Sequence, residues 1–183
     1  MKKGVNRITI SAILVAFALS LFAIELLLPP FPFCPSAKIG LSNIVTLFMV
    51  TNRHFFKASD CFLVLVTRCL LSAIVTGRIM SVIFSLTGGL LALVTMLIIA
   101  RLAGFRSSVL VSISGSVIHN IAQMGVAILI YGTFSAVYYL PALFLTGVAS
   151  GIITGLCVSL VNNNKFLYNY INSEVYSDGK RKN

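Results

Sequence analysis

Charged side chains are scarce in this chain. They make up only 10% of its 183 residues, whereas 58% of the residues are hydrophobic. A soluble domain has about 25% charged and about 45–50% apolar residues. The mean hydropathy of +1.00 departs in the same direction. The polar groups of this chain are too few to cover the surface of a soluble protein. The composition therefore predicts a protein of the cell membrane, surrounded by lipid.

Several signatures of cofactor chemistry are also missing. The four cysteines, Cys34, Cys61, Cys69 and Cys157, show no C-x-x-C spacing, and three of them lie inside apolar runs. This pattern argues against a disulfide framework, a zinc site, a haem site or an iron–sulfur site. The chain also lacks a G-x-x-x-x-G-K-[ST] phosphate loop, so any ATPase must be a partner. We therefore predict no cofactor and no metal.

The net charge of +10 could indicate a nucleic-acid partner, but the placement of the charges argues otherwise. The basic residues fall in short connections between apolar runs, as membrane topology signals do. No basic stripe is interleaved with exposed aromatic residues, which is the usual footprint of nucleic-acid binding. We predict no nucleic-acid partner.

The apolar runs predict an all-α membrane protein, a bundle of six transmembrane helices. The spans are 8–29, 39–51, 59–76, 80–100, 109–131 and 137–161. The membrane domain covers 1–162, and 163–183 form a polar cytoplasmic tail. The second span is short, since about thirteen residues reach only ~20 Å of a ~30 Å hydrocarbon core. Either the proline-rich stretch before it dips into the membrane, or its neighbours shield it.

The distribution of basic residues predicts that both termini are cytoplasmic. With the N-terminus inside, only Lys38 and Arg78 fall in outer segments. The inner segments hold Lys2, Lys3, Arg7, Arg53, Lys57, Arg101, Arg106, Lys165, Lys180, Arg181 and Lys182. This bias follows the positive-inside rule, and an odd number of spans would break it.

The stretch SISGSVIHNIAQ places polar side chains in the middle of the fifth span. At about 100° per residue they share one face about 120° wide. These residues are Ser108, Ser112, Ser116, His119, Asn120 and Gln123. Facing lipid would cost several kcal/mol, so this face must turn toward other helices or a cavity. We expect the serines to bond across helices and His119, Asn120 and Gln123 to form a ligand or translocation site.

Arg68 is a second polar residue at membrane depth. It lies about eleven residues, or ~16 Å, from the inner end of its span, too deep to reach the interface easily. It therefore needs a carboxylate, backbone carbonyls or an anionic ligand. Glu25 is the only carboxylate at membrane depth, because Asp60 stands at the very start of the third span. A structural Arg68–Glu25 pair and an arginine that faces a ligand both remain open.

Small residues predict two smooth helix faces. Gly147, Gly151 and Gly155 form a double GxxxG pattern on the sixth span, which predicts close contact with another helix. Ala12 and Ala16 form a similar face on the first span.

Five stretches together resemble a known family. They are AKIGLSNIVTL (37–47), RCLLSAIVTGR (68–78), FSLTGGLLALVTM (84–96), SISGSVIHNIAQ (112–123) and YLPALFLTGVASGIITGL (139–156). They resemble the Gx transporter family, whose members are also labelled heptaprenyl diphosphate synthase component I, over residues 8–162. The family is similar to the six-helix S components of energy-coupling-factor (ECF) transporters.

The resemblance implies a transport subunit that captures a small molecule outside the cell. It would hand the molecule over against a partner T protein driven by ATPase subunits. Ala12 and Ala16 would contact that partner, and 31–38 would gate the site. The ligand, which the resemblance leaves open, could be isoprenoid or vitamin-like. The expected ligand-binding residues are Glu25, Asn43, Arg68, His119, Asn120 and Gln123.

Two other functions stay open. The synthase label, taken literally, requires clustered aspartates that hold Mg²⁺ against a diphosphate. The acidic residues here are Glu25, Asp60, Glu174 and Asp178, and no two are adjacent. We therefore predict no catalytic residue in this chain, which could still serve as a non-catalytic membrane component of isoprenoid or quinone side-chain synthesis. The last alternative is a scaffold subunit in a membrane redox or transport complex.

Overall fold

The computed structural model describes residues 2–27, 40–53, 55–103, 107–132 and 134–164. Within these ranges the chain is helical and forms no strand. The elements are α1 (Lys2–Leu27), α2 (Asn43–Thr51), α3 (Ala58–Thr76), α4 (Met80–Leu102), α5 (Ser108–Tyr131), the 3₁₀ helix η1 (Phe134–Tyr139) and α6 (Leu140–Asn163). All but the first two residues of the predicted tail, 165–183, lie outside the described residues.

Five of these segments are long and apolar enough to cross a membrane. They are Ile8–Leu27, Ala58–Thr76, Met80–Leu102, Ser108–Tyr131 and Val137–Asn163. A helix satisfies its own backbone hydrogen bonds, which is what a segment surrounded by lipid requires. The protein is therefore a multi-pass membrane protein, as its composition predicts.

The short helix α2 differs from the predicted second span. It begins at Asn43 instead of Ile39, and its nine residues rise only about 13 Å. It is therefore not one of the segments that can cross a membrane alone, and a count of six crossing helices is not confirmed. Seven of its nine residues are buried, and it contacts each of the other five α-helices. The expected shielding by neighbouring helices is present, and α2 forms the centre of the bundle.

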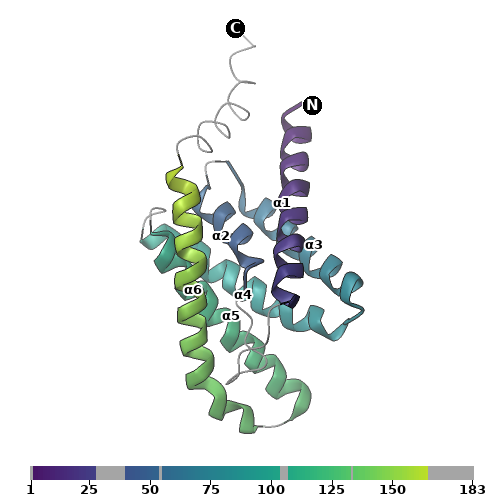
Figure 1. The fold of residues 1–183 in the computed structure, drawn as a ribbon, viewed down its shortest axis with the longest axis vertical. Coiled ribbons are helices and arrows are strands. Elements are labelled where there is room, and N and C mark those ends of the chain that lie inside the picture. Colours follow the sequence, from purple (N-terminus) through teal and green to yellow (C-terminus); the bar gives the residue numbers. More distant parts are fainter. Residues whose placement is uncertain (1, 28–39, 54, 104–106, 133, 165–183) are drawn as a thin grey trace.

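The two ends of the described chain lie together. Figure 1 shows the first turn of α1 and the last turn of α6 at the same end of the molecule. Which side of the membrane this end faces stays a prediction from the basic residues.

The glycine face of α6 lies directly on the backbone of α5. A Cβ atom at Gly151 would lie 2.5 Å from the Cα of Ile113, and one at Gly155 would lie 2.6 Å from the Cα of Val109. At Gly147 the distance to the Cα of Val117 would be 3.1 Å. Side chains at these positions would push the two helices apart, so the absence of a side chain permits the contact.

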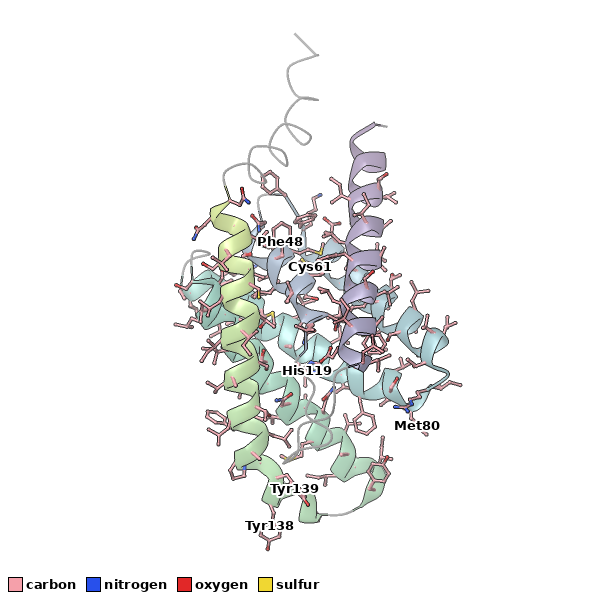
Figure 2. The ribbon with its side chains drawn as sticks, viewed as in Figure 1. Phe48, Cys61, Met80, His119, Tyr138 and Tyr139 are labelled. Atoms are coloured by element: carbon pink, nitrogen blue, oxygen red, sulfur yellow. The ribbon has the colours of Figure 1, made fainter. Side chains whose placement is uncertain are left out.

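Exposed aromatic residues gather where α5 leads into α6. Tyr131, Tyr138 and Tyr139 are 71%, 89% and 58% exposed. Figure 2 shows Tyr138 and Tyr139 at the end of the molecule opposite to the first turn of α1, whereas His119 lies inside the bundle. Tyrosines with exposed rings at a bundle end are typical of the boundary between lipid and water.

Candidate functional site

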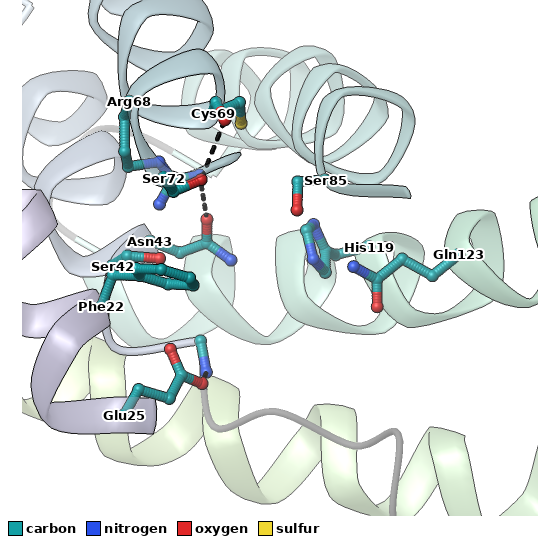
Figure 3. A pocket seen from close by; sticks show the side chains of 11 residues that line it. Phe22, Glu25, Ser42, Asn43, Arg68, Cys69, Ser72, Ser85, His119 and Gln123 are labelled. Atoms are coloured by element: carbon teal, nitrogen blue, oxygen red, sulfur yellow. Dashed lines mark hydrogen bonds between the residues drawn. The ribbon is translucent and has the colours of Figure 1, made fainter. Parts of the chain in front are cut away.

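A small polar pocket lies among the first five helices (Figure 3). The residues that line it are Phe22, Glu25, Gly40, Ser42, Asn43, Arg68, Cys69, Ser72, Ser85, His119 and Gln123. Its volume is about 40 Å³. Since one water occupies about 10–15 Å³ by this measure, the pocket has room for roughly three or four water-sized groups. Helices α1 to α5 and the turn before α2 thus build one compact site.

Arg68 projects into this pocket from the middle of α3. Only 5% of its surface is exposed, and it lies about 12 Å along the helix axis from Thr76, the last residue of α3. Its Nη2 donates a hydrogen bond of 3.2 Å to Oδ1 of Asn43. Its Nη1 is buried and has no hydrogen-bond partner within the described part of the chain. A buried charged donor left without an acceptor costs several kcal/mol, so this nitrogen calls for water or a ligand.

Glu25 lines the same pocket close to the end of α1. Its Oε1 accepts a hydrogen bond of 2.6 Å from the backbone N–H of Gly40. Gly40 has φ +73°, in the left-handed region that favours glycine. Because this turn needs no side chain, the backbone can bring its N–H to the carboxylate.

The question of an Arg68–Glu25 pair is decided by these bonds. Each residue bonds to a different group, Arg68 to Asn43 and Glu25 to Gly40. Figure 3 shows the two side chains on different sides of the pocket, with Asn43 between them. The arginine therefore faces the pocket and not the carboxylate, and the two residues give the pocket opposite charges on separate walls.

His119 and Gln123 reach the pocket from α5, as the sequence predicts. A Cβ atom at Gly88 of α4 would lie 3.0 Å from Cγ of Gln123 and 3.0 Å from two atoms of the His119 ring. Gly88 therefore leaves the space that these two side chains occupy. Ser85, almost one turn earlier on α4, lines the pocket beside them.

Asn120, which the sequence groups with His119 and Gln123, does not line this pocket. It is 6% exposed, and its Nδ2 donates a hydrogen bond of 3.0 Å to the carbonyl oxygen of Leu143 on α6. On a helical wheel Asn120 lies about 60° from Gln123, and this angle turns it toward a different neighbour. The predicted polar face is thus divided between the pocket and the α5–α6 contact.

The serines of this face follow the division. Ser112 and Thr154 of α6 share a hydrogen bond of 2.7 Å between their hydroxyl groups. Ser108 and Ser116 are buried as well. The Ser112–Thr154 bond is an interhelix bond of the kind expected for these serines.

Other residues of the pocket were not among the predicted site residues. Ser72 stands one turn after Arg68, at the i+4 spacing that shares a helix face, and its Oγ donates to the carbonyl oxygen of Cys69 at 2.9 Å. Phe22 stands three residues before Glu25 on α1. These spacings are signals that could have found Ser72 and Phe22. No comparable signal points to Ser42 or Ser85, because their places depend on how separate helices pack.

The remaining predicted residues lie apart from the pocket. Ala12 and Ala16 are exposed on α1, on a face that no other described helix covers. The predicted gate, 31–38, lies outside the described residues.

Comparison with known proteins adds one finding. The family model of heptaprenyl diphosphate synthase component I matches residues 14–161. The chain belongs to this family. The match confirms the resemblance of the five sequence stretches, and it includes every residue that lines the pocket. No curated protein and no solved structure matches the chain.

Proposed function

We propose that this protein is the substrate-binding subunit of a membrane importer, similar to the S components of ECF transporters. It binds a small molecule in the pocket of α1 to α5, and partner T and ATPase subunits drive uptake. The observation that carries this proposal is Arg68, a charged group at membrane depth with a buried donor nitrogen that finds no acceptor among the described residues. Ionisable groups inside a membrane are expensive, and their usual justification is a ligand or a transport path.

The surface of α1 supports a partner. Ala12 and Ala16 expose a smooth strip on the outside of the bundle. Small side chains allow a second helix to approach closely in a membrane. A binding subunit that carries no phosphate loop needs such a surface in order to couple with an ATPase.

The family description favours a second candidate, a membrane component of a prenyl diphosphate synthase. The words component I imply another component, which would supply the catalysis. In the described part of the chain the carboxylates are Glu25 on α1 and Asp60 on α3, and no three side chains of the metal-binding kinds are grouped together. In this role the chain would hold or present a lipid substrate without catalysing prenyl transfer.

Affinity purification of the full chain from its own membranes tests both candidates. Three variants accompany the wild type: Arg68→Gln in the pocket, Ala16→Leu on α1 and Arg101→Gln as a control, because Arg101 is an exposed arginine in the last turn of α4. Mass spectrometry identifies retained subunits and small molecules. We expect T and ATPase subunits with every form except Ala16→Leu, and a small molecule with every form except Arg68→Gln.

A different outcome would overturn the import proposal. If the chain retains a prenyl synthase subunit instead, and adding it to that subunit raises prenyl transfer, the second candidate replaces the first. If Arg68→Gln keeps the small molecule of the wild type, the pocket is not the binding site.

A further inference from the structure

We infer that the pocket binds one carboxylate group through Arg68. This inference depends on the proposed binding function and names the chemical class of the ligand, a compound with a single small acidic group. Its basis is a guanidinium group that lines the pocket and is only 5% exposed. The Nη1 nitrogen of this group finds no acceptor among the described residues.

The chain itself offers Arg68 no opposite charge at close range within its described part. The hydrogen bond of 3.2 Å from Nη2 goes to Oδ1 of Asn43, which is a neutral amide. Glu25, on another side of the pocket, is engaged by its own partners, and the Gly40 N–H is one of them. Asp60 stands eight positions earlier on α3, about 12 Å away along the helix axis. Because a buried charge without compensation is unfavourable, Arg68 calls for an anion from outside the chain.

The charges of the pocket limit this anion to a single negative charge. Arg68 is the one arginine or lysine among the described lining residues, and Glu25 already brings a carboxylate. A dianion would therefore carry a second negative charge that no fixed cation of the lining matches. A neutral carbonyl group could accept from Nη1, but hydrogen bonds to a charged acceptor are about twice as strong. A monoanion should thus bind more tightly than either a dianion or a neutral group.

Neutral donors complete the lining around the arginine. Gln123 on α5, Ser85 on α4 and Ser42 before α2 all line the pocket, and their amide and hydroxyl groups can donate to an oxyanion. Figure 3 shows these side chains on different sides of the same space as Arg68. The two oxygens of a carboxylate accept about four hydrogen bonds in total. A carboxylate can therefore bond to Arg68 and to neutral donors at the same time.

The volume of the pocket matches one such group. About 40 Å³ accommodates roughly three or four water-sized groups. The one carbon and two oxygens of a carboxylate fit this space, whereas a prenyl chain or a quinone ring does not. The carboxylate belongs either to a small free ion, such as formate, or to the end of a larger substrate whose remainder extends out of the pocket.

Probes of matched shape in lipid nanodiscs test the inference. The full chain is titrated with formate, formamide and inorganic phosphate, and binding is measured from the shift of the thermal unfolding midpoint. Formamide has the shape of formate without its charge, and phosphate is mostly a dianion in the mildly alkaline buffer. Ionic strength is held constant and chloride is left out, since a halide would compete for the same cation. We expect formate to bind at least tenfold more tightly than formamide or phosphate.

A series of longer carboxylates distinguishes the two sources of the group. Acetate, propionate and butyrate extend formate by one carbon at a time. If the ligand is a small free ion, affinity should fall as the chain outgrows the pocket. If the carboxylate is the end of a larger substrate, affinity should stay level or rise along the series. Both results support a carboxylate site.

Substitutions at Arg68 assign the binding to its guanidinium group. Arg68→Gln should abolish the response to formate. Arg68→Lys keeps the charge but loses the planar group of donors, so we expect weaker and still measurable binding. The control Arg101→Gln, which changes an exposed arginine on α4, should respond as the wild type does. Should Arg68→Gln fail to fold, the ranking of the three probes on the wild type still decides the question.

Three results would overturn the inference: formamide or phosphate binding as tightly as formate, no shift of the midpoint with formate, or unchanged formate binding in folded Arg68→Gln. Failure here is distinguishable from failure of the import proposal. If purification yields T and ATPase subunits but formate does not bind, import stands and the carboxylate ligand is wrong. If formate binds as expected but the chain retains a prenyl synthase subunit instead, the ligand class stands and the import proposal is wrong.

Discussion

Replacing Gly151 by alanine should weaken the contact between α5 and α6 more than any other single methyl group on the glycine face. The new Cβ would lie 2.5 Å from Cα and 2.9 Å from N of Ile113. Carbon atoms attract best at about 3.5–4.0 Å, and these two neighbours are backbone atoms that cannot rotate away. The helices must therefore separate by about 1 Å at this point.

The cost of this separation follows from the packing that is lost. The full attraction of one atom pair is ~0.1–0.2 kcal/mol. A gap of about 0.5–1 Å removes a quarter to a half of this attraction. About 30 pairs around the crossing would lose about 1–2 kcal/mol in total. The hydrogen bond of 2.7 Å between Ser112 and Thr154 would stretch as well, at about 0.6 kcal/mol. We expect Gly151→Ala to lower the free energy of unfolding by about 2 kcal/mol.

Reversible unfolding in mixed micelles, driven by sodium dodecyl sulfate, measures this loss. Gly125→Ala on α5 is the matched control, because a Cβ there meets nothing within 4 Å. It should leave stability unchanged or raise it by up to about 1 kcal/mol through helix propensity. The distances also predict a gradient, with Gly155→Ala (2.6 Å) close to Gly151→Ala and Gly147→Ala (3.1 Å) milder. Equal unfolding curves for Gly151→Ala and Gly125→Ala would refute the reasoning.

Two further substitutions separate the pocket from the packing beside it. Gly88→Ala should lower severalfold the amount of small molecule that the purified protein retains, because its Cβ would lie 3.0 Å from the His119 ring in the pocket. The loss of stability should be less than about 1 kcal/mol, since the new Cβ moves a side chain and no backbone. Mass spectrometry checks the first and micelle unfolding the second, and unaltered retention would contradict the prediction. Asn120→Ala should cost only about 0.6 kcal/mol in stability, since Thr146 also donates to the Leu143 carbonyl at 3.0 Å. The purified variant should still retain the small molecule of the wild type, and its loss with stability intact would place Asn120 in the binding site.

The pocket residues differ in how far the sequence could predict them. Arg68 was identifiable because a lone arginine deep in an apolar run is anomalous in any fold. His119 and Gln123 were identifiable because a polar face has to avoid lipid. Asn120 shared that face but lies outside the pocket, because a helical wheel gives directions and does not say which helix lies in each direction. Ser42 and Ser85 were missed for the same reason.

The short helix α2 shows the same division. The apolar run before Thr51 was visible, and so was the shortage of residues for a full crossing. That α2 begins at Asn43 and contacts every other helix is a property of the packed bundle. Some of the residues that bury α2 lie more than a hundred positions away in the chain. Asn52, just beyond α2, donates a hydrogen bond of 2.9 Å to the side chain of Asn162 on α6.

By itself the sequence determined the membrane class, the long helices, the family and the presence of polar groups that lipid cannot accommodate. These follow from local properties, namely the apolar content of each run and the cost of burying a charge. Only the tertiary structure decided which polar groups meet. It separated Arg68 from Glu25, joined Asn120 to α6, and enclosed one pocket among five helices. Each of these depends on the angle and distance at which separate helices cross, and those are set by close contacts such as the glycine face of α6.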